Sequence, residues 1–253
     1  MSSDTPDSTR FVDQLADSLP AGTVFRPGTE PYATSTSPDN SSFRQRPEAV
    51  VCPRTTDDAA AAVTLARALG LRVAVQATGH GAGSPLGAGL VLVDTSALDA
   101  VSIDPAARTA RVGAGVTWSK VQAQAETHGL LALSGTSPTV GVSGYTFNGG
   151  VGWLARPFGL ASASLRTVEY VDGVGRVHRV ADDGADGADE VEREALWAFR
   201  GGDIVGDPRP HDGVRALPEA AVVGAGGLRV LLGAWPEDRS GRQRAGQLVD
   251  EAR

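Results

Sequence analysis

Residues 134–154 constrain the fold of this chain more than any other part of its sequence. Glycine, serine and threonine crowd this stretch, but it also carries large apolar side chains, including Tyr145, Trp153 and Leu154. A loop that is simply solvated rarely holds that much apolar surface. Small residues that alternate with large ones suit a backbone wrapped around a large, flat ligand. We therefore interpret the stretch as one wall of a ligand site.

A second glycine-rich segment, residues 79–83, directly follows a strand that the sequence predicts over residues 72–76. Glycine after a strand lets backbone N–H groups come close to a ligand and point toward an anion. His80 lies in the middle of this segment. Taken alone, however, the segment is better explained as a tight turn that happens to contain a histidine.

Hydrophobic periodicity predicts an α+β protein. Residues 46–76 read as strand, helix and strand, because Thr55 is typical of a helix N-cap and Gly70 of the residue just past a helix. Residues 27–42 read as a loop that follows one short N-terminal helix. Thr117 is predicted to cap a further helix. The remaining predicted elements are strands over 90–93, 101–103, 110–112, 165–171, 176–180 and 228–232, and helices over 118–128, 192–199 and 243–252.

Composition argues against several functional classes. The formal net charge of −7 disfavours a nucleic-acid surface, because phosphate binding there needs concentrated lysine and arginine. Backbone N–H groups can still bind an anionic cofactor. Cys52 is the only cysteine, so we expect neither an internal disulfide nor a cysteine-based metal cluster, and the histidines are too scattered for a metal site. Without a basic, apolar leader or an apolar run of membrane length, we expect a cytoplasmic protein that does not enter a membrane.

Three rival motifs fail on inspection. A hydrolase nucleophile elbow needs Gly-x-Ser-x-Gly, but the run around Ser143 has Tyr145 in the place of the last glycine. A Rossmann fingerprint needs a third glycine, but Gly113 and Gly115 are followed by Trp118 at that position. A phosphate loop needs a Gly-Lys pair, and the single lysine of the chain lies outside any such run. An unrelated hydrolase is therefore disfavoured.

A series of short motifs runs in order through most of the chain. They lie at residues 46–50, 79–81, 94–96, 112–118, 128–130, 134–145, 149–153, 158–160 and 196–202. In this order they resemble the FAD-binding domain of the vanillyl-alcohol oxidase and p-cresol methylhydroxylase superfamily. Within it, the chain looks most like the berberine-bridge-enzyme-like FAD-linked oxidoreductases. Many segments in the right order are more specific than any single motif.

The resemblance implies two α/β subdomains, a small parallel βαβ lobe and a lobe with a mixed or antiparallel sheet, which together sandwich FAD. It divides the chain into an N-terminal extension (1–45), an FAD-binding domain (46–202) and a degenerate or truncated remnant of the substrate domain (203–253). Residues 76–82 would cradle the pyrophosphate, His80 would be joined covalently to the 8α-methyl group of the flavin, and Val171 would lie near the adenine. The implied cofactor-binding residues are Gln76, Thr78, Gly79, His80, Gly81, Ala82, Gly135, Thr136, Ser137, Val140, Gly141, Gly144, Tyr145, Gly149, Gly150, Gly152, Trp153, Leu154 and Val171.

The sequence departs from the family pattern at several points. Ser137 stands where doubly linked members carry a cysteine, so only the histidine link is expected, and Ala163 stands where members usually carry an aspartate. Residues 203–208 lack the Gly-Asn-Phe-Gly-Val-Val-type strand that normally closes on the cofactor here. Residues 214–253 resemble only weakly the start of the substrate domain, which normally supplies the pocket wall and the catalytic base.

These observations lead us to expect an FAD-binding oxidoreductase. It would oxidise a small organic substrate of the alcohol, sugar or amine type by hydride transfer to the flavin, with the site completed by a partner chain or a second copy of the chain. Tyr145 reads as an aromatic packed on the cofactor or the core, not as the base. The alternative is a truncated or degenerate flavin-fold protein that is not a catalyst. Residues 134–153 favour the first reading, and the altered region at 203–208 favours the second.

Overall fold

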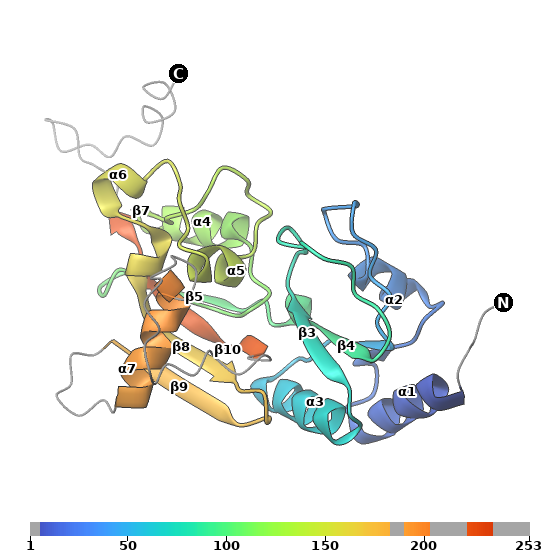
Figure 1. Ribbon diagram of the computed structural model, residues 1–253. Coiled ribbons are helices and arrows are strands. Elements are labelled where there is room, and N and C mark those ends of the chain that lie inside the picture. The colour runs from blue at the N-terminus through green and yellow to red at the C-terminus, as the bar shows by residue number, and fades with distance from the viewer. Residues whose placement is uncertain (1–5, 183–189, 203–221, 235–253) are drawn as a thin grey trace, which may run out of the picture.

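The computed structural model describes residues 6–182, 190–202 and 222–234 of the chain. It confirms the predicted α+β architecture, in which two lobes lie side by side and each is built around its own sheet (Figure 1). Among these residues, no helix combines the length and the apolar character that crossing a membrane requires.

The small lobe contains a four-stranded sheet with the order β1-β2-β4-β3. β2 and β3 both run parallel to β4, whereas β1 runs antiparallel to β2. This sheet, with a helix between β2 and β3, is the parallel βαβ lobe that the sequence predicts. Its elements are α1 (Pro6–Ser18), β1 (Val24–Phe25), α2 (Glu30–Ser35), β2 (Ala49–Val51), α3 (Thr56–Ala68), β3 (Arg72–Gln76) and β4 (Leu90–Asp94).

Helix α3 shows how the local sequence sets an element of this lobe. Thr55 Oγ1 accepts a hydrogen bond from the backbone N–H of Asp58, and the Asp58 carboxylate accepts one from the backbone N–H of Thr55. Gly70 adopts φ +71°, the left-handed conformation that favours glycine just past a helix. Ala59 and Val63 are buried between these ends. Both predicted ends of the helix are confirmed.

The large lobe contains a five-stranded antiparallel sheet with the order β5-β6-β10-β8-β9. Its strands are β5 (Val101–Asp104), β6 (Thr109–Val112), β8 (Leu165–Val171), β9 (Val177–Ala181) and β10 (Val222–Leu231). A two-stranded ladder joins β7 (Leu130–Leu131) to β11 (Gly233–Ala234). The helices are α4 (Trp118–Glu126), α5 (Val142–Phe147), α6 (Ala155–Phe158) and α7 (Glu190–Trp197), and the other helical turns are η1 (Thr95–Ala97), η2 (Ala161–Ser164) and η3 (Ala198–Gly202).

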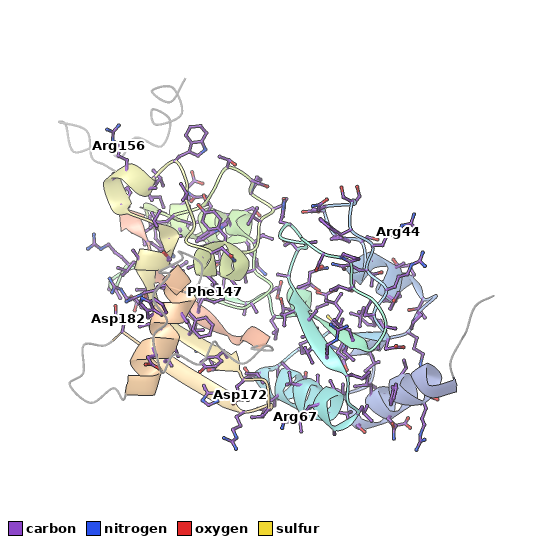
Figure 2. The ribbon with its side chains drawn as sticks, viewed as in Figure 1. Arg44, Arg67, Phe147, Arg156, Asp172 and Asp182 are labelled. Atoms are coloured by element: carbon purple, nitrogen blue, oxygen red, sulfur yellow. The ribbon has the colours of Figure 1, made fainter. Side chains whose placement is uncertain are left out.

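Aromatic side chains fill the core between this sheet and its helices. Trp118, at the start of α4, is 1% exposed, and Leu165 and Val168 from β8 are fully buried in the same cluster. Phe147 lies at the end of α5 (Figure 2). Its ring packs against that of Phe199, with the ring centroids 5.1 Å apart. The core therefore holds α5 in a fixed place on the large lobe.

Strand β10 occupies the middle of the large sheet, between β6 and β8. The predicted strand over 228–232 is confirmed, although β10 already begins at Val222. The chain thus supplies a central strand further along than the family pattern predicts. Residues 203–208, where that pattern places its strand, and the predicted helix over 243–252 lie outside the described residues.

One local prediction is wrong, and a second holds in position but not in its side-chain contact. Residues 27–42 do not form only a loop, because α2 lies within them, with Pro31 in its first turn, where a missing N–H costs no helical hydrogen bond. Thr117 is the N-cap residue of α4, as predicted, and its carbonyl accepts the first helical hydrogen bonds, although its hydroxyl lies 3.0 Å from Ser119 Oγ and caps no backbone N–H.

The two lobes share a buried contact below the cleft that separates them. Val63 of α3 and Val93 of β4 belong to the same core cluster as Val171, at the end of β8. The turn after Val171 carries Asp172, which lies beside α3 in Figure 2. Because the side chains of one lobe complete the core of the other, the facing surfaces of the lobes are held in a defined arrangement.

Candidate functional site

A cavity of about 640 Å³ lies between the lobes. The loop that follows β3 forms one wall, and the segment that leads into α5 forms the other. Ten of the predicted cofactor-binding residues line it together, although the two segments are about sixty residues apart in the chain. They are Gln76, Thr78, Gly79, His80, Gly81, Ala82, Val140, Gly141, Gly144 and Tyr145.

The loop wall presents unsatisfied backbone donors. Among the residues that the structure describes, the four backbone N–H groups of residues 78–81 meet no hydrogen-bond acceptor. Gly79 adopts φ +75°, and a Cβ there would come within 2.7 Å of Pro38 Cβ, so only glycine fits this turn. Successive free amides in a turn form an anion-binding concavity. This wall is therefore suited to a phosphate group.

His80 stands beside these amides with its ring held at one nitrogen. Its Nε2 lies 2.7 Å from Asp39 Oδ2 and 2.9 Å from Thr139 Oγ1. Thr139 Oγ1 is itself 3.2 Å from Ser137 Oγ. The histidine thus joins the small lobe to the glycine-rich segment of the large lobe. It is partly exposed and lines the cavity.

A chain of amide side chains supports the floor of the loop. Gln76 Nε2 donates to the carbonyl of Ser35, and Gln76 Oε1 accepts from Gln45 Nε2 at 2.7 Å. Gln45 is 7% exposed and lines the cavity, and its Oε1 has no hydrogen-bond partner among the described residues. The sequence interpretation missed Gln45 and Asn148, which also line the cavity. For Gln45, its position directly before the Arg46-Pro47 motif was the only signal in the sequence.

Tyr145 is chiefly a packing residue, as the sequence predicts. Its ring meets Trp118 edge-on, with centroids 5.6 Å apart. Cβ atoms at Gly135, Gly150 and Gly152 would come within 3 Å of its side chain. Its hydroxyl is buried without a partner among the described residues, and burial raises the pKa of Tyr145. The hydroxyl therefore stays protonated at neutral pH, which does not suit a base.

The other predicted contacts do not line this cavity. Gly135, Gly150 and Gly152 lie around the Tyr145 ring, and Ser137 reaches Thr139. Trp153 is 68% exposed, and Val171 is fully buried in the core that the lobes share. Their contact with a cofactor stays a prediction, as does that of Thr136, Gly149 and Leu154.

The residues present fit FAD. The cavity volume lies in the range of small-molecule and cofactor sites. The free amides of the loop match a pyrophosphate, and His80 provides a nucleophilic nitrogen next to them. Across the described residues, no group of three or more His, Cys, Asp or Glu side chains could hold a metal ion. The polar chemistry of the site is thus that of backbone amides, one histidine and neutral side chains, with Asp39 at its edge.

Comparison with known proteins identifies the same cofactor. The model of a family described as an FAD binding domain matches residues 47–181. An FAD-linked oxidoreductase of Dictyostelium discoideum is 30% identical over 195 residues, which cover 77% of this chain and 41% of that protein. Berberine bridge enzyme-like 23 of Arabidopsis thaliana is 31% identical over 166 residues, which cover 62% of this chain and 30% of that protein.

A solved structure confirms the fold. The crystal structure of 6-hydroxy-D-nicotine oxidase from Arthrobacter nicotinovorans superposes with a TM-score of 0.71 at 28% identity, over 85% of this chain and 42% of that one. The chain therefore spans less than half the length of the relatives that it matches. Because the family model covers more than half of the chain and includes residues from both walls of the cavity, the chain belongs to the family described as an FAD binding domain, and its relatives include an FAD-linked oxidoreductase and a berberine bridge enzyme-like protein.

Proposed function

We propose that this chain binds FAD in the cavity between its lobes and serves the oxidation of a small organic substrate of the alcohol, sugar or amine type. The observation that carries the proposal is the row of free backbone amides at residues 78–81, with His80 among them, on the wall of a cavity of cofactor size. This is the arrangement that an extended dinucleotide needs.

The residues would divide the work as follows. The amides of residues 78–81 would bind the pyrophosphate, and Gly144, where an added Cβ would meet nothing within 4 Å, leaves the opposite wall open to the flavin. When bound, FAD would supply an acceptor for the hydride that leaves a substrate C–H bond next to a hydroxyl or amine, with dioxygen as the final oxidant. The protein supplies position and electrostatics. We also propose that His80 holds the flavin covalently.

The experiment is a spectrum of the purified chain before and after acid precipitation. Bound FAD gives visible flavin absorption after incubation with FAD, and a covalent link leaves the yellow colour in the protein pellet. His80→Ala is expected to abolish the colour of the pellet. His128→Ala is the matched control and is expected to retain the colour, because His128 is exposed just past α4 and is not among the residues that line the cavity.

The same measurement separates the two readings of the sequence. A chain that stays colourless after incubation with FAD would refute FAD binding and favour the non-catalytic flavin-fold reading. If the chain binds FAD but alcohols, sugars and amines do not reduce the bound flavin under anaerobic conditions, the proposed substrate oxidation is refuted and FAD binding stands.

A second protein surface, from another copy of the chain or from a partner chain, is proposed to complete the site. Exposed apolar side chains gather in residues 151–160, where Val151 is 74% exposed and Trp153 is 68% exposed. Adjacent exposed apolar residues of this kind mark contact surfaces. The mass of the purified chain in solution, compared with that of Trp153→Ser, tests the second-copy version: a monomer in both cases would exclude it.

A further inference from the structure

A short segment ahead of the family match is bound along the His80 loop. The carbonyl of Ser35 accepts a hydrogen bond from Gln76 Nε2 at 2.9 Å, and Asn40 Nδ2 donates to the carbonyl of Ala82 at 3.3 Å. Pro38, between them, is buried against Gly79. Residues 35–40 therefore form an outer layer of the loop, although the family model begins only at residue 47.

This layer brings one charged group to the histidine. Asp39 Oδ2 lies 2.7 Å from His80 Nε2, and the Thr139 hydroxyl lies 2.9 Å from the same nitrogen. A carboxylate can only accept a hydrogen bond, so Nε2 must carry the hydrogen. A neutral imidazole holds one hydrogen, which leaves the lone pair on Nδ1. Nδ1 has no hydrogen-bond partner among the residues described.

We propose that Asp39 is a positioning residue for His80. It fixes the imidazole as the Nε2–H tautomer and so makes Nδ1 the nitrogen that reacts with the cofactor. This inference rests on the proposed function, because it assumes that FAD occupies the cavity. Asp39 does not touch the reacting atoms and acts through the imidazole, as the carboxylate does in other Asp–His pairs.

The covalent step balances with these groups. Nδ1 forms a bond to the 8α carbon of the flavin, that carbon loses a proton, and the electron pair of its broken C–H bond passes into the ring system. Dioxygen removes the two electrons and, with two protons, leaves as hydrogen peroxide. Nε2 releases the second proton as the alkylated imidazole returns to neutrality. Until then the ring is cationic, and the carboxylate of Asp39 stabilises that charge.

The first test needs no cofactor. ¹⁵N NMR of the imidazole nitrogens in the cofactor-free protein, above the pH at which the imidazole is protonated, reports which nitrogen carries the hydrogen. We expect the Nε2–H tautomer in the wild type, a mixture of tautomers in Asp39→Ala and recovery of the Nε2–H form in Asp39→Glu. Asp13→Ala is the matched control, because Asp13 is 54% exposed against 53% for Asp39 and pairs with Arg26 instead. An unchanged tautomer in Asp39→Ala would overturn the proposal.

The second test measures the rate at which added FAD becomes acid-stable in the protein. Asp39→Ala is expected to slow this by about tenfold or more, the size of effect seen when a hydrogen-bond partner of a functional histidine is removed. Reversible FAD affinity should change little, and Asp13→Ala should match the wild type in both. Equal rates in Asp39→Ala and wild type would refute the inference while leaving FAD binding intact. A wild type that binds no FAD refutes the proposed function instead, and the NMR result then decides the role of Asp39.

Discussion

The two glycine-rich segments of this protein have similar compositions, but most of their glycines serve different purposes. In the loop after β3, the backbone of residues 78–81 faces the cavity with its N–H groups free. In residues 134–154, Gly135, Gly150 and Gly152 pack against the Tyr145 side chain. At Gly81 the missing side chain leaves the backbone open to a ligand, whereas at Gly135, Gly150 and Gly152 it leaves room for an aromatic ring.

The difference shows that a glycine-rich motif does not by itself locate a ligand. At Gly81 and Gly144 an added Cβ would meet nothing within 4 Å, and both residues line the cavity. At Gly152 an added Cβ would lie 2.1 Å from the carbonyl oxygen of Ser134. Substitutions at these positions should therefore separate folding from cofactor binding.

The largest effect is expected for Gly152→Ala. Its methyl group would overlap the carbonyl oxygen of Ser134 and press on the Tyr145 hydroxyl, 2.9 Å away. We expect a loss of about 3 kcal/mol in the free energy of unfolding, the upper range for overpacking. Urea denaturation of the cofactor-free protein measures it. A loss below about 0.5 kcal/mol, the range of neutral surface changes, would show that this segment is not packed as described.

Gly79→Ala should have the next largest effect, for a different reason. The residue would have to adopt φ +75° and would meet Pro38, so we expect a loss of about 2 kcal/mol from backbone strain and displacement of the neighbouring segment. FAD affinity should fall as well, because the amides of the loop would move. Thermal unfolding measures the loss of stability, and an FAD titration measures the loss of affinity. A variant with wild-type stability and wild-type FAD affinity would contradict the conformation of the loop.

Tyr145→Phe should raise stability by about 1 kcal/mol in the cofactor-free protein, because it removes a buried hydroxyl that has no partner among the described residues. It also has a pH signature. Burial raises the pKa of Tyr145 above that of the unfolded chain, so the wild type loses stability as pH rises beyond about 10. That loss should be smaller in Tyr145→Phe. Urea denaturation at pH 7 and pH 10.5 measures the gain in stability and its dependence on pH. An equal loss of stability between the two pH values in both proteins would show that the Tyr145 hydroxyl is not buried as described.

The smallest effect on folding is expected for Gly81→Ala, at a position without steric conflict. Its unfolding free energy should stay within about 0.5 kcal/mol of the wild type. FAD affinity should nevertheless fall about tenfold, because the methyl group narrows the approach to the amides, and this equals about 1.4 kcal/mol of binding free energy. Gly144→Ala on the opposite wall is the companion variant. Unchanged FAD affinity in both would place the cofactor elsewhere.

Local chemistry made much of the fold predictable. The capping pair of Thr55 and Asp58 and the left-handed Gly70 depend on neighbours in the chain, so sequence alone locates α3. The loop at residues 78–81 was predictable for the same reason, because small residues follow directly after a strand. The Ser134 to Tyr145 motif was recognisable through its family resemblance, which also pointed to the lobe arrangement.

Contacts between distant segments were not predictable. Asp39 and His80 are 41 residues apart, and nothing in the residues around Asp39 signals a partner. Which glycines serve the cavity and which serve Tyr145 depends on how α5 packs against Trp118, a tertiary property. The central position of β10 likewise depends on pairing across more than fifty residues.

That central position sets an order of assembly for the large lobe. β5 with β6, and β8 with β9, are hairpins formed by neighbouring residues, so each can form soon after it leaves the ribosome. Only β10 joins the two pairs, and it is the last of the five strands to be synthesised. Until it inserts, each hairpin has an open edge, which is a site for pairing with other chains. The lobe that carries the second wall of the FAD cavity is thus closed by a late, long-range step, and cofactor binding depends on that step being completed.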